Sequence, residues 1–231
     1  MSELFVVATP IGNLEDITRR ALRILSEVDL IAAEDTRHTK KLLDHYQIST
    51  PQTSYHKFNI RAKTGYLIKL LKAGKKIALV SDSGMPGISD PGYELIRESL
   101  DQDIRVTPIP GPSAVITALA VSGLPTDKFI FLGFLPKKPG KRRKALKDLK
   151  DFTGSIILYE SPFRIVKCLE DIHSALGDRP VAVARELTKI YEEVIRGKAS
   201  QLIERFKNRS PKGEMVVIIG GLTSGAQSGE I

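Results

Sequence analysis

Short apolar runs alternate with helix-like segments in the first half of the chain, and this alternation restricts the possible fold most strongly. The apolar runs cover residues 4–8, 30–33, 77–80 and 104–109. Between the first two runs, apolar residues follow the i, i+4, i+7, i+8 spacing of an amphipathic helix: Ile17, Ala21, Ile24, Leu25 and Val28. Strands that alternate with helices predict βαβ units and a parallel sheet.

The same reasoning extends to the rest of the chain. Further helices are expected at about 40–46, 59–73 and 113–121. After a linker at 122–128, strand-like runs follow with fewer helices between them, at 129–136, 155–162, 180–187, 191–197 and 214–221. The fold class is therefore α/β, with a parallel sheet in the first domain and a mixed sheet in the second.

Composition and linker position divide the chain into three parts. We expect a first domain at 1–120, a second domain at 121–222, and a tail at 223–231. At 231 residues the chain is long enough for two modest cores. The tail has too little apolar surface to pack and is expected to be disordered.

Each apolar run of the first domain ends in a distinctive loop. The loops read "TPIGNLED", "EDTRHT", "SDSGMPGISD" and "PGPSA" in chain order. In open α/β sheets, ligands bind beyond the carboxyl ends of the strands. Three of these loops are rich in Gly and Pro, which leaves backbone N–H and C=O groups open to a ligand. These loops therefore predict a ligand site.

Two aspartates of the third loop have different expected roles. Asp90 precedes Pro91, the pattern of a helix N-cap followed by proline at the first helical position. Asp82 lies just after the strand, where a carboxylate can accept hydrogen bonds from a ribose diol or an amine. Ser161-Pro162 is a second cap pair, and Ser113 stands at a helix start that offers N–H donors to a polar ligand.

Several familiar chemistries have no signal in the chain. The glycines form no G-x-G, P-loop or G-x-S-x-G motif. Four histidines without metal spacing and a single cysteine, Cys168, predict no metal site. The lone cysteine, expected to be a core thiol, suits a cytoplasmic protein. No apolar run approaches the roughly 18 residues of a membrane span, and the N-terminus does not resemble a signal peptide.

The positive charge is concentrated in one segment. Residues 137–150 carry eight basic side chains and one acidic one, in a chain of net charge +8. A narrow apolar stripe (Ala145, Leu146, Leu149, Phe152) predicts a docked helix with its basic residues in solvent. Such a face can neutralise the phosphates of a polyanionic partner; a merely solvated helix is the alternative. The residues expected to bind these phosphates are Lys141, Arg142, Arg143, Lys144 and Lys147.

Seven segments in order resemble one family: "VVATPIGNLEDIT", "AAEDTRHTKKLL", "SDSGMPGISDPG", "PIPGPSAVITALAVSGLP", "FLGFLP", "YESPFRI" and "ARELTKIYEE". They are similar to the bacterial 16S rRNA (cytidine) 2′-O-methyltransferases, a branch of the tetrapyrrole-methylase family. The resemblance covers about residues 4–221. It implies two α/β domains with S-adenosylmethionine in the cleft between them, a homodimer, and 16S rRNA or the small ribosomal subunit as substrate.

The resemblance also implies site residues. It places Pro10 against the cofactor through its backbone, and makes the other cofactor-binding residues Asp82, Met85, Ser113, Ala114, Glu160 and Leu187. The third loop, "SDSGMPGISD", corresponds to the main cofactor loop of the family and is called the main loop below. It departs from the wider family, which usually has Gly-Asp-Pro where this chain has Ser81-Asp82-Ser83. The first loop also lacks the wider family's Gly-x-Gly-Pro-Gly. Both departures fit the ribosomal branch.

Candidate catalysts come from two acidic motifs. A general base for a ribose hydroxyl is expected among Glu34 and Asp35 of "EDTR" or Glu186 of "AREL". Each motif has an arginine, Arg37 in the first, that can hold an RNA phosphate or keep the carboxylate ionised. The alternative is structural: the first motif caps the next helix and pairs locally, and Arg185-Glu186 forms an inter-domain ion pair.

Two other functions stay open at this point. A methylase of the same fold could act on a tetrapyrrole or a protein side chain, although a small substrate does not require the basic run. A non-catalytic RNA-binding module is the second alternative, although it has no use for ligand-type loops at four strand ends.

Overall fold

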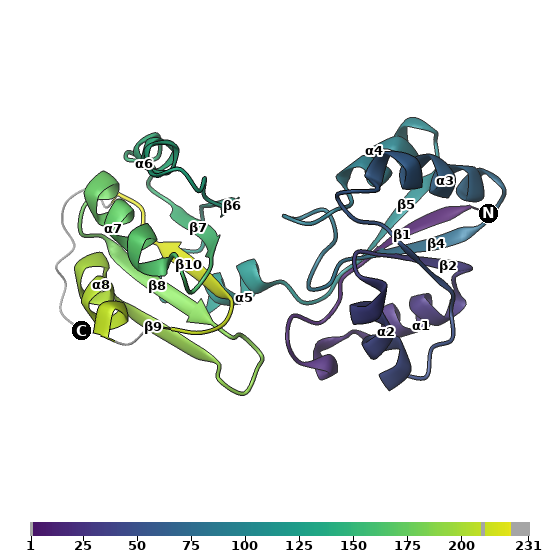
Figure 1. Ribbon diagram of the computed structural model, residues 1–231, viewed down its shortest axis with the longest axis horizontal. Coiled ribbons are helices and arrows are strands. Elements are labelled where there is room, and N and C mark those ends of the chain that lie inside the picture. Colours follow the sequence, from purple (N-terminus) through teal and green to yellow (C-terminus); the bar gives the residue numbers. More distant parts are fainter. Residues whose placement is uncertain (1, 209–210, 223–231) are drawn as a thin grey trace. The chain divides into compact units, whose positions relative to one another are not determined.

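The computed structural model describes residues 2–208 and 211–222, so the expected tail lies outside the described residues. The chain forms two compact units, Met1–Ser113 and Ala114–Ile231 (Figure 1). The division precedes α5 (Ala114–Ala120), a helix that the sequence interpretation grouped with the first domain. In the structure this helix packs against strands of the second unit.

The first unit contains a fully parallel five-stranded sheet, as predicted. Its order is β3-β2-β4-β1-β5. The strands are β1 (Glu3–Val7), β2 (Leu30–Ala33), β3 (Gln52–Ser54), β4 (Lys76–Val80) and β5 (Arg105–Ile109). Strand β3 was not predicted, because its three residues are polar and only half-buried at the sheet edge.

Helices cover both faces of this sheet (Figure 1). Because side chains alternate along a strand, Phe5 and Val7 pack with α1 and α2 on one face, whereas Leu4 packs with α3 and α4 on the other. The bounds are η1 (Leu14–Asp16), α1 (Arg19–Glu27), α2 (Thr36–His45), α3 (Ile60–Lys72) and α4 (Tyr93–Asp101). Helix α1 starts at the cap residue Thr18, whose hydroxyl accepts the Ala21 N–H at 3.1 Å.

The second unit contains a mixed sheet, also as predicted. Its order is β6-β7-β10-β8-β9, in which only the β6–β7 pair is parallel. The strands are β6 (Phe129–Phe134), β7 (Ser155–Glu160), β8 (Pro180–Arg185), β9 (Glu193–Lys198) and β10 (Met215–Ile219). Helices α6 (Pro139–Lys147), α7 (Ile165–Leu176) and α8 (Ala199–Asn208) share one core with this sheet.

The predicted cap at Asp90-Pro91 is wrong. Helix α4 begins at Tyr93, and its N-cap is Gly92 with a φ of +154°. A Cβ on Gly92 would lie 2.8 Å from the Gly87 nitrogen, so the backbone segments at Gly87 and Gly92 approach too closely for any other residue at position 92. The loop therefore runs past Asp90 before the helix starts.

The predicted cap at Ser161-Pro162 is also displaced. Helix α7 begins at Ile165, with Arg164 at the N-cap position. The Ser161 carbonyl still accepts the N–H groups of Arg164 and Ile165, at 3.0 and 3.1 Å, so it closes the turn before the helix.

Across the residues placed in the structure, no helix is both long and apolar enough to cross a membrane.

Candidate functional site

The carboxyl ends of β2 and β4 form a topological switch point in the first unit. These two strands are neighbours in the sheet. From β2 the chain continues to β3 at one edge, whereas from β4 it continues past β1 to β5 in the opposite direction. In open α/β sheets the diverging connections leave a crevice where ligands bind. Glu34, Asp35 and Asp82 follow these two strand ends.

Hydrogen bonds hold these three acidic residues together. The Asp35 N–H donates to Asp82 Oδ1 at 3.0 Å, and the Asp82 N–H donates to Glu34 Oε2 at 3.4 Å. Burial raises the pKa of Glu34, and the negative charge of Asp82 raises it further, against a lowering by the Asp82 N–H. Glu34 thus accepts a proton more readily than an ordinary glutamate.

Asp35 has the opposite electrostatic environment. Its Oδ1 accepts the Arg37 N–H at 2.9 Å and so caps α2, and its Oδ2 pairs with Arg37 Nη2 at 2.7 Å. These hydrogen bonds hold the pKa of Asp35 far below its usual range. The local cap and ion pair, expected as the structural alternative, are therefore present for Asp35 and Arg37.

The loops after β1, β4 and β5 are packed against one another. Thr9 and Gly84 exchange backbone hydrogen bonds at 2.9 and 3.0 Å, and the Thr9 hydroxyl donates to the Ser81 carbonyl at 3.1 Å. A Cβ on Gly111 would lie 2.9 Å from that of Ala8, so only glycine lets the loop after β5 approach the loop after β1. Pro10, Asp82, Met85 and Ser113 lie on these loops.

In the second unit, Glu160 ends β7 with an almost completely buried side chain. Its Oε1 accepts the Ser161 N–H at 2.8 Å and lies 3.4 Å from Arg164 Nε. Among the described residues its Oε2 is buried without a hydrogen-bond partner. The Cys168 thiol nearby is a weak donor; burial, and then the charge of Glu160, raise its pKa. Glu160 Oε2 is thus an acceptor suited to a ligand donor.

Glu186 and Leu187 lie on the loop after β8. Glu186 has a φ of +49°, and its Oε1 accepts from Lys189 Nζ at 3.1 Å and from the Glu214 N–H at 3.2 Å. Arg185 pairs with Glu193 at 2.8 Å, and all of these partners belong to the second unit. Leu187 is buried, and Ala114 begins α5 in the same unit.

Helix α6 exposes only part of its basic set. Arg142 was expected in solvent, but its side chain is 6% exposed and donates from Nε to Asp171 Oδ2 at 2.6 Å. The reason is helical spacing: Arg142 and the buried Leu146 are four residues apart and face α7 together. The exposed basic residues are Lys141, Arg143, Lys144 and Lys147.

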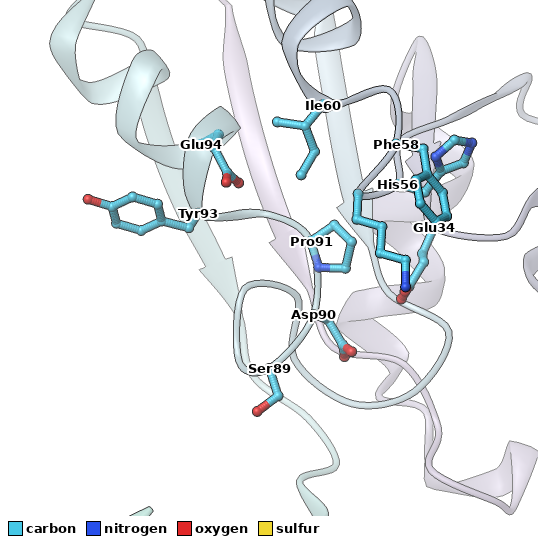
Figure 2. A pocket seen from close by; sticks show the side chains of 10 residues that line it. Glu34, His56, Phe58, Ile60, Ser89, Asp90, Pro91, Tyr93 and Glu94 are labelled. Atoms are coloured by element: carbon cyan, nitrogen blue, oxygen red, sulfur yellow. The ribbon is translucent and has the colours of Figure 1, made fainter. Parts of the chain in front are cut away.

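A cavity of about 590 Å³ lies beside Glu34 and was not predicted. It is formed by the segment after β3 and the segment that leads into α4, with His56, Phe58, Tyr93 and Glu94 among its lining residues (Figure 2). The signal for it was the aromatic "YHKF" run. Because β3 was missed, this run was not recognised as another loop at the carboxyl edge of the sheet.

Comparisons with known proteins agree on one family. The family described as Tetrapyrrole (Corrin/Porphyrin) Methylases matches residues 3–203. A protein of Thermotoga maritima named ribosomal RNA small subunit methyltransferase I is 51% identical over 96% of this chain and 99% of its own length. Proteins of the same name from Halalkalibacterium halodurans and a Synechocystis species are 51% and 52% identical, over 94% and 96% of this chain and 75% and 80% of theirs.

Solved structures share the fold at low sequence identity. A cobalt precorrin-4 methyltransferase superimposes with a TM-score of 0.68 at 18% identity, covering 94% of each chain. A diphthine synthase superimposes with a TM-score of 0.72 at 15% identity, covering 95% of this chain and 90% of its own. At such identities the likeness shows the fold alone.

Proposed function

The chain belongs to the tetrapyrrole (corrin/porphyrin) methylase family, and we propose that it transfers a methyl group from S-adenosylmethionine to the ribose 2′-oxygen of a cytidine in 16S rRNA. The observation that carries the proposal is the identity of 51–52% to three proteins named ribosomal RNA small subunit methyltransferase I. The cytidine and the 2′-oxygen rest on the sequence resemblance. We further propose that the protein acts in the cytoplasm as a homodimer.

The residues of both units fit the cofactor chemically. When bound, S-adenosylmethionine supplies an electrophilic methyl group on a sulfonium. In the first unit, Asp82 uses one carboxylate oxygen to accept the Asp35 N–H, and the other is suited to a ribose diol or an amine. In the second unit, the buried Glu160 Oε2 is an acceptor suited to a donor of the ligand. The remaining residues proposed to hold the cofactor are Pro10, Met85, Ser113, Ala114 and Leu187.

Glu34 is the general base that the electrostatics favour. Its raised pKa brings it closer to neutral pH, where a general base is most effective. Its Oε2 accepts the Asp82 N–H, so Oε1 is the oxygen proposed to take the ribose proton. Asp35 is held ionised by Arg37 and is a weak base, and Glu186 is bound by Lys189 and Glu214. We assign these two a positioning role.

RNA phosphates are proposed to bind the exposed side of α6. Lys141, Arg143, Lys144 and Lys147 are exposed on this helix, whereas Arg142 is removed from the RNA-binding set by its buried ion pair. Arg37, with an 88% exposed side chain, is a further phosphate contact near Glu34 in sequence. Phosphate contacts position an RNA without reading its sequence. The target must then be chosen by shape or by an unstacked nucleotide.

The test is a methyl-transfer assay with three substrates. Protein and labelled S-adenosylmethionine are incubated with small ribosomal subunits, free 16S rRNA or a tetrapyrrole. We expect label in RNA, and 2′-O-methylcytidine after complete nuclease digestion and mass spectrometry. Label in the tetrapyrrole, or none in either RNA sample, would overturn the proposal and favour the alternatives. Sedimentation of the free protein tests the homodimer.

A further inference from the structure

The cavity beside Glu34 has the apolar lining expected of a nucleobase site. Phe58 and Tyr93 line it although these residues are 85% and 67% exposed, and Ile60 and Pro91 add apolar surface. Figure 2 shows Glu34 and Phe58 on one side of Pro91, with Tyr93 and Glu94 on the other. The volume of the cavity, about 590 Å³, falls within the usual range for small-ligand pockets, roughly 300–1,000 Å³.

The exposed ring of Phe58 is the most informative feature of this cavity. Lys57 Nζ lies over the ring, 4.9 Å from its centroid, and the His56 and Phe58 rings form an edge-type pair with 6.0 Å between their centroids. Single-stranded RNA is recognised by stacking its unpaired bases on aromatic side chains. A ring flanked by a cation is a favourable platform for such stacking, because the cation can also meet the adjacent phosphate.

The charges of the lining residues indicate which groups the ligand presents. Three carboxylates, on Glu34, Asp90 and Glu94, face one lysine and one histidine. This excess of acidic over basic side chains disfavours a phosphate inside the cavity and favours hydrogen-bond donors. The exocyclic amino group of cytosine or adenine is such a donor, whereas uracil presents an acceptor at the corresponding position.

We infer that this cavity takes the base of the target nucleotide, stacked on Phe58, and that its carboxylates favour a base with an exocyclic amino group over uracil. The inference rests on the proposed function and identifies its substrate-binding pocket. The base enters from an unstacked position, and its ribose is then held next to Glu34, which lines the same cavity. Phe58 is thereby a residue that binds and positions the substrate.

The experiment compares three variants on small ribosomal subunits. Phe58→Ala removes the stacking surface and is expected to lower kcat/KM for methyl transfer by roughly 10- to 100-fold. Phe58→Trp keeps an aromatic face and is expected to restore most of the activity. Tyr66→Ala is the matched control, because Tyr66 is also an exposed ring with a lysine over it, Lys63 Nζ at 5.2 Å, but it lies outside the cavity.

Two readouts separate this inference from the proposed function. Calorimetric binding of S-adenosylmethionine and the denaturation midpoint are expected to be unchanged in Phe58→Ala, so a loss of activity reports substrate binding. RNA with uridine at the methylated position is expected to be a poor substrate of the wild-type protein. If the wild-type protein methylates RNA while Phe58→Ala is equally active, or the uridine RNA is methylated equally well, this inference fails and the proposed function stands.

Discussion

Two adjacent carboxylates at the end of β2 show how strongly the environment of a residue determines its chemistry. Glu34 and Asp35 are neighbours in sequence, yet burial raises the pKa of the first and Arg37 lowers that of the second. The carboxylate with the raised pKa is the better proton acceptor of the two. The pair therefore separates into a candidate base and a structural cap.

This separation predicts the pH dependence of activity. The ionised form of Glu34 is the active one, so activity is expected to fall as the pH drops through its raised pKa, above the ordinary value of 4.5. Glu34→Gln is expected to lower kcat by about 100-fold or more and to remove this acidic limb. Asp35→Asn is the control, since the low pKa of Asp35 keeps it ionised across the same range. An unchanged pH profile in Glu34→Gln would exclude Glu34 as the base.

At this scale the sequence identified the candidates but not their roles. It placed Glu34, Asp35 and Asp82 beyond strand ends because the apolar runs before them are clear. It could not rank them, because the hydrogen bond between residues 35 and 82 joins the loops after two strands that are adjacent only in the folded sheet. Phe58 was missed for the related reason that β3, which precedes it, has no apolar signal.

Helix α6 illustrates the limits of pattern reading for a whole element. The apolar stripe correctly predicted a helix that docks through Leu146, with Ala145, Leu149 and Phe152 packed against the same core. It did not predict that Arg142 extends this docked face, because a basic residue is rarely buried without a partner. The partner is Asp171 on α7, a position that periodicity cannot reveal.

The buried ion pair predicts a large difference between two neighbouring arginines. Arg142→Ala leaves Asp171 buried without its partner and is expected to lower the free energy of unfolding by about 3–5 kcal/mol. Arg143→Ala removes a half-exposed side chain 3.7 Å from the same carboxylate and is expected to cost less than about 1 kcal/mol. Denaturant unfolding measures both. Equal effects of the two substitutions would contradict the assignment of Arg142 to the core.

For the whole molecule, the excess positive charge and the candidate general base belong to different units. Residues 1–113 carry 15 basic and 14 acidic side chains, whereas residues 114–231 carry 20 basic and 13 acidic ones. The candidate general base and the cavity proposed to take the nucleobase lie in the nearly neutral unit. Attraction of RNA is therefore expected to come mainly from the second unit, and selection of the nucleotide from the first.

Charge reversal tests this division of labour. Lys141→Glu with Lys144→Glu is expected to weaken RNA binding and to reduce the slope of log K against log salt by roughly 1 to 2 units, as two phosphate contacts are lost. Lys41→Glu with Lys69→Glu is the matched control, because it makes the same charge change on exposed residues of the first unit. Titrations of fluorescent RNA at several salt concentrations measure the slope. An equal loss in both double variants would mean that only net charge matters.

The paired backbone hydrogen bonds between Thr9 and Gly84 fix the first loop and the main loop against each other. A substitution in one of these segments, which are 75 residues apart in the chain, is therefore expected to require a compensating substitution in the other. Replacing Ser81-Asp82-Ser83 with the Gly-Asp-Pro of the wider family, without also replacing the "TPIGN" loop, is expected to leave the two loops mismatched where they bond to each other. Anyone who redesigns this protein for another acceptor would have to exchange both halves at once, because the energetic effects of residues in contact are not additive.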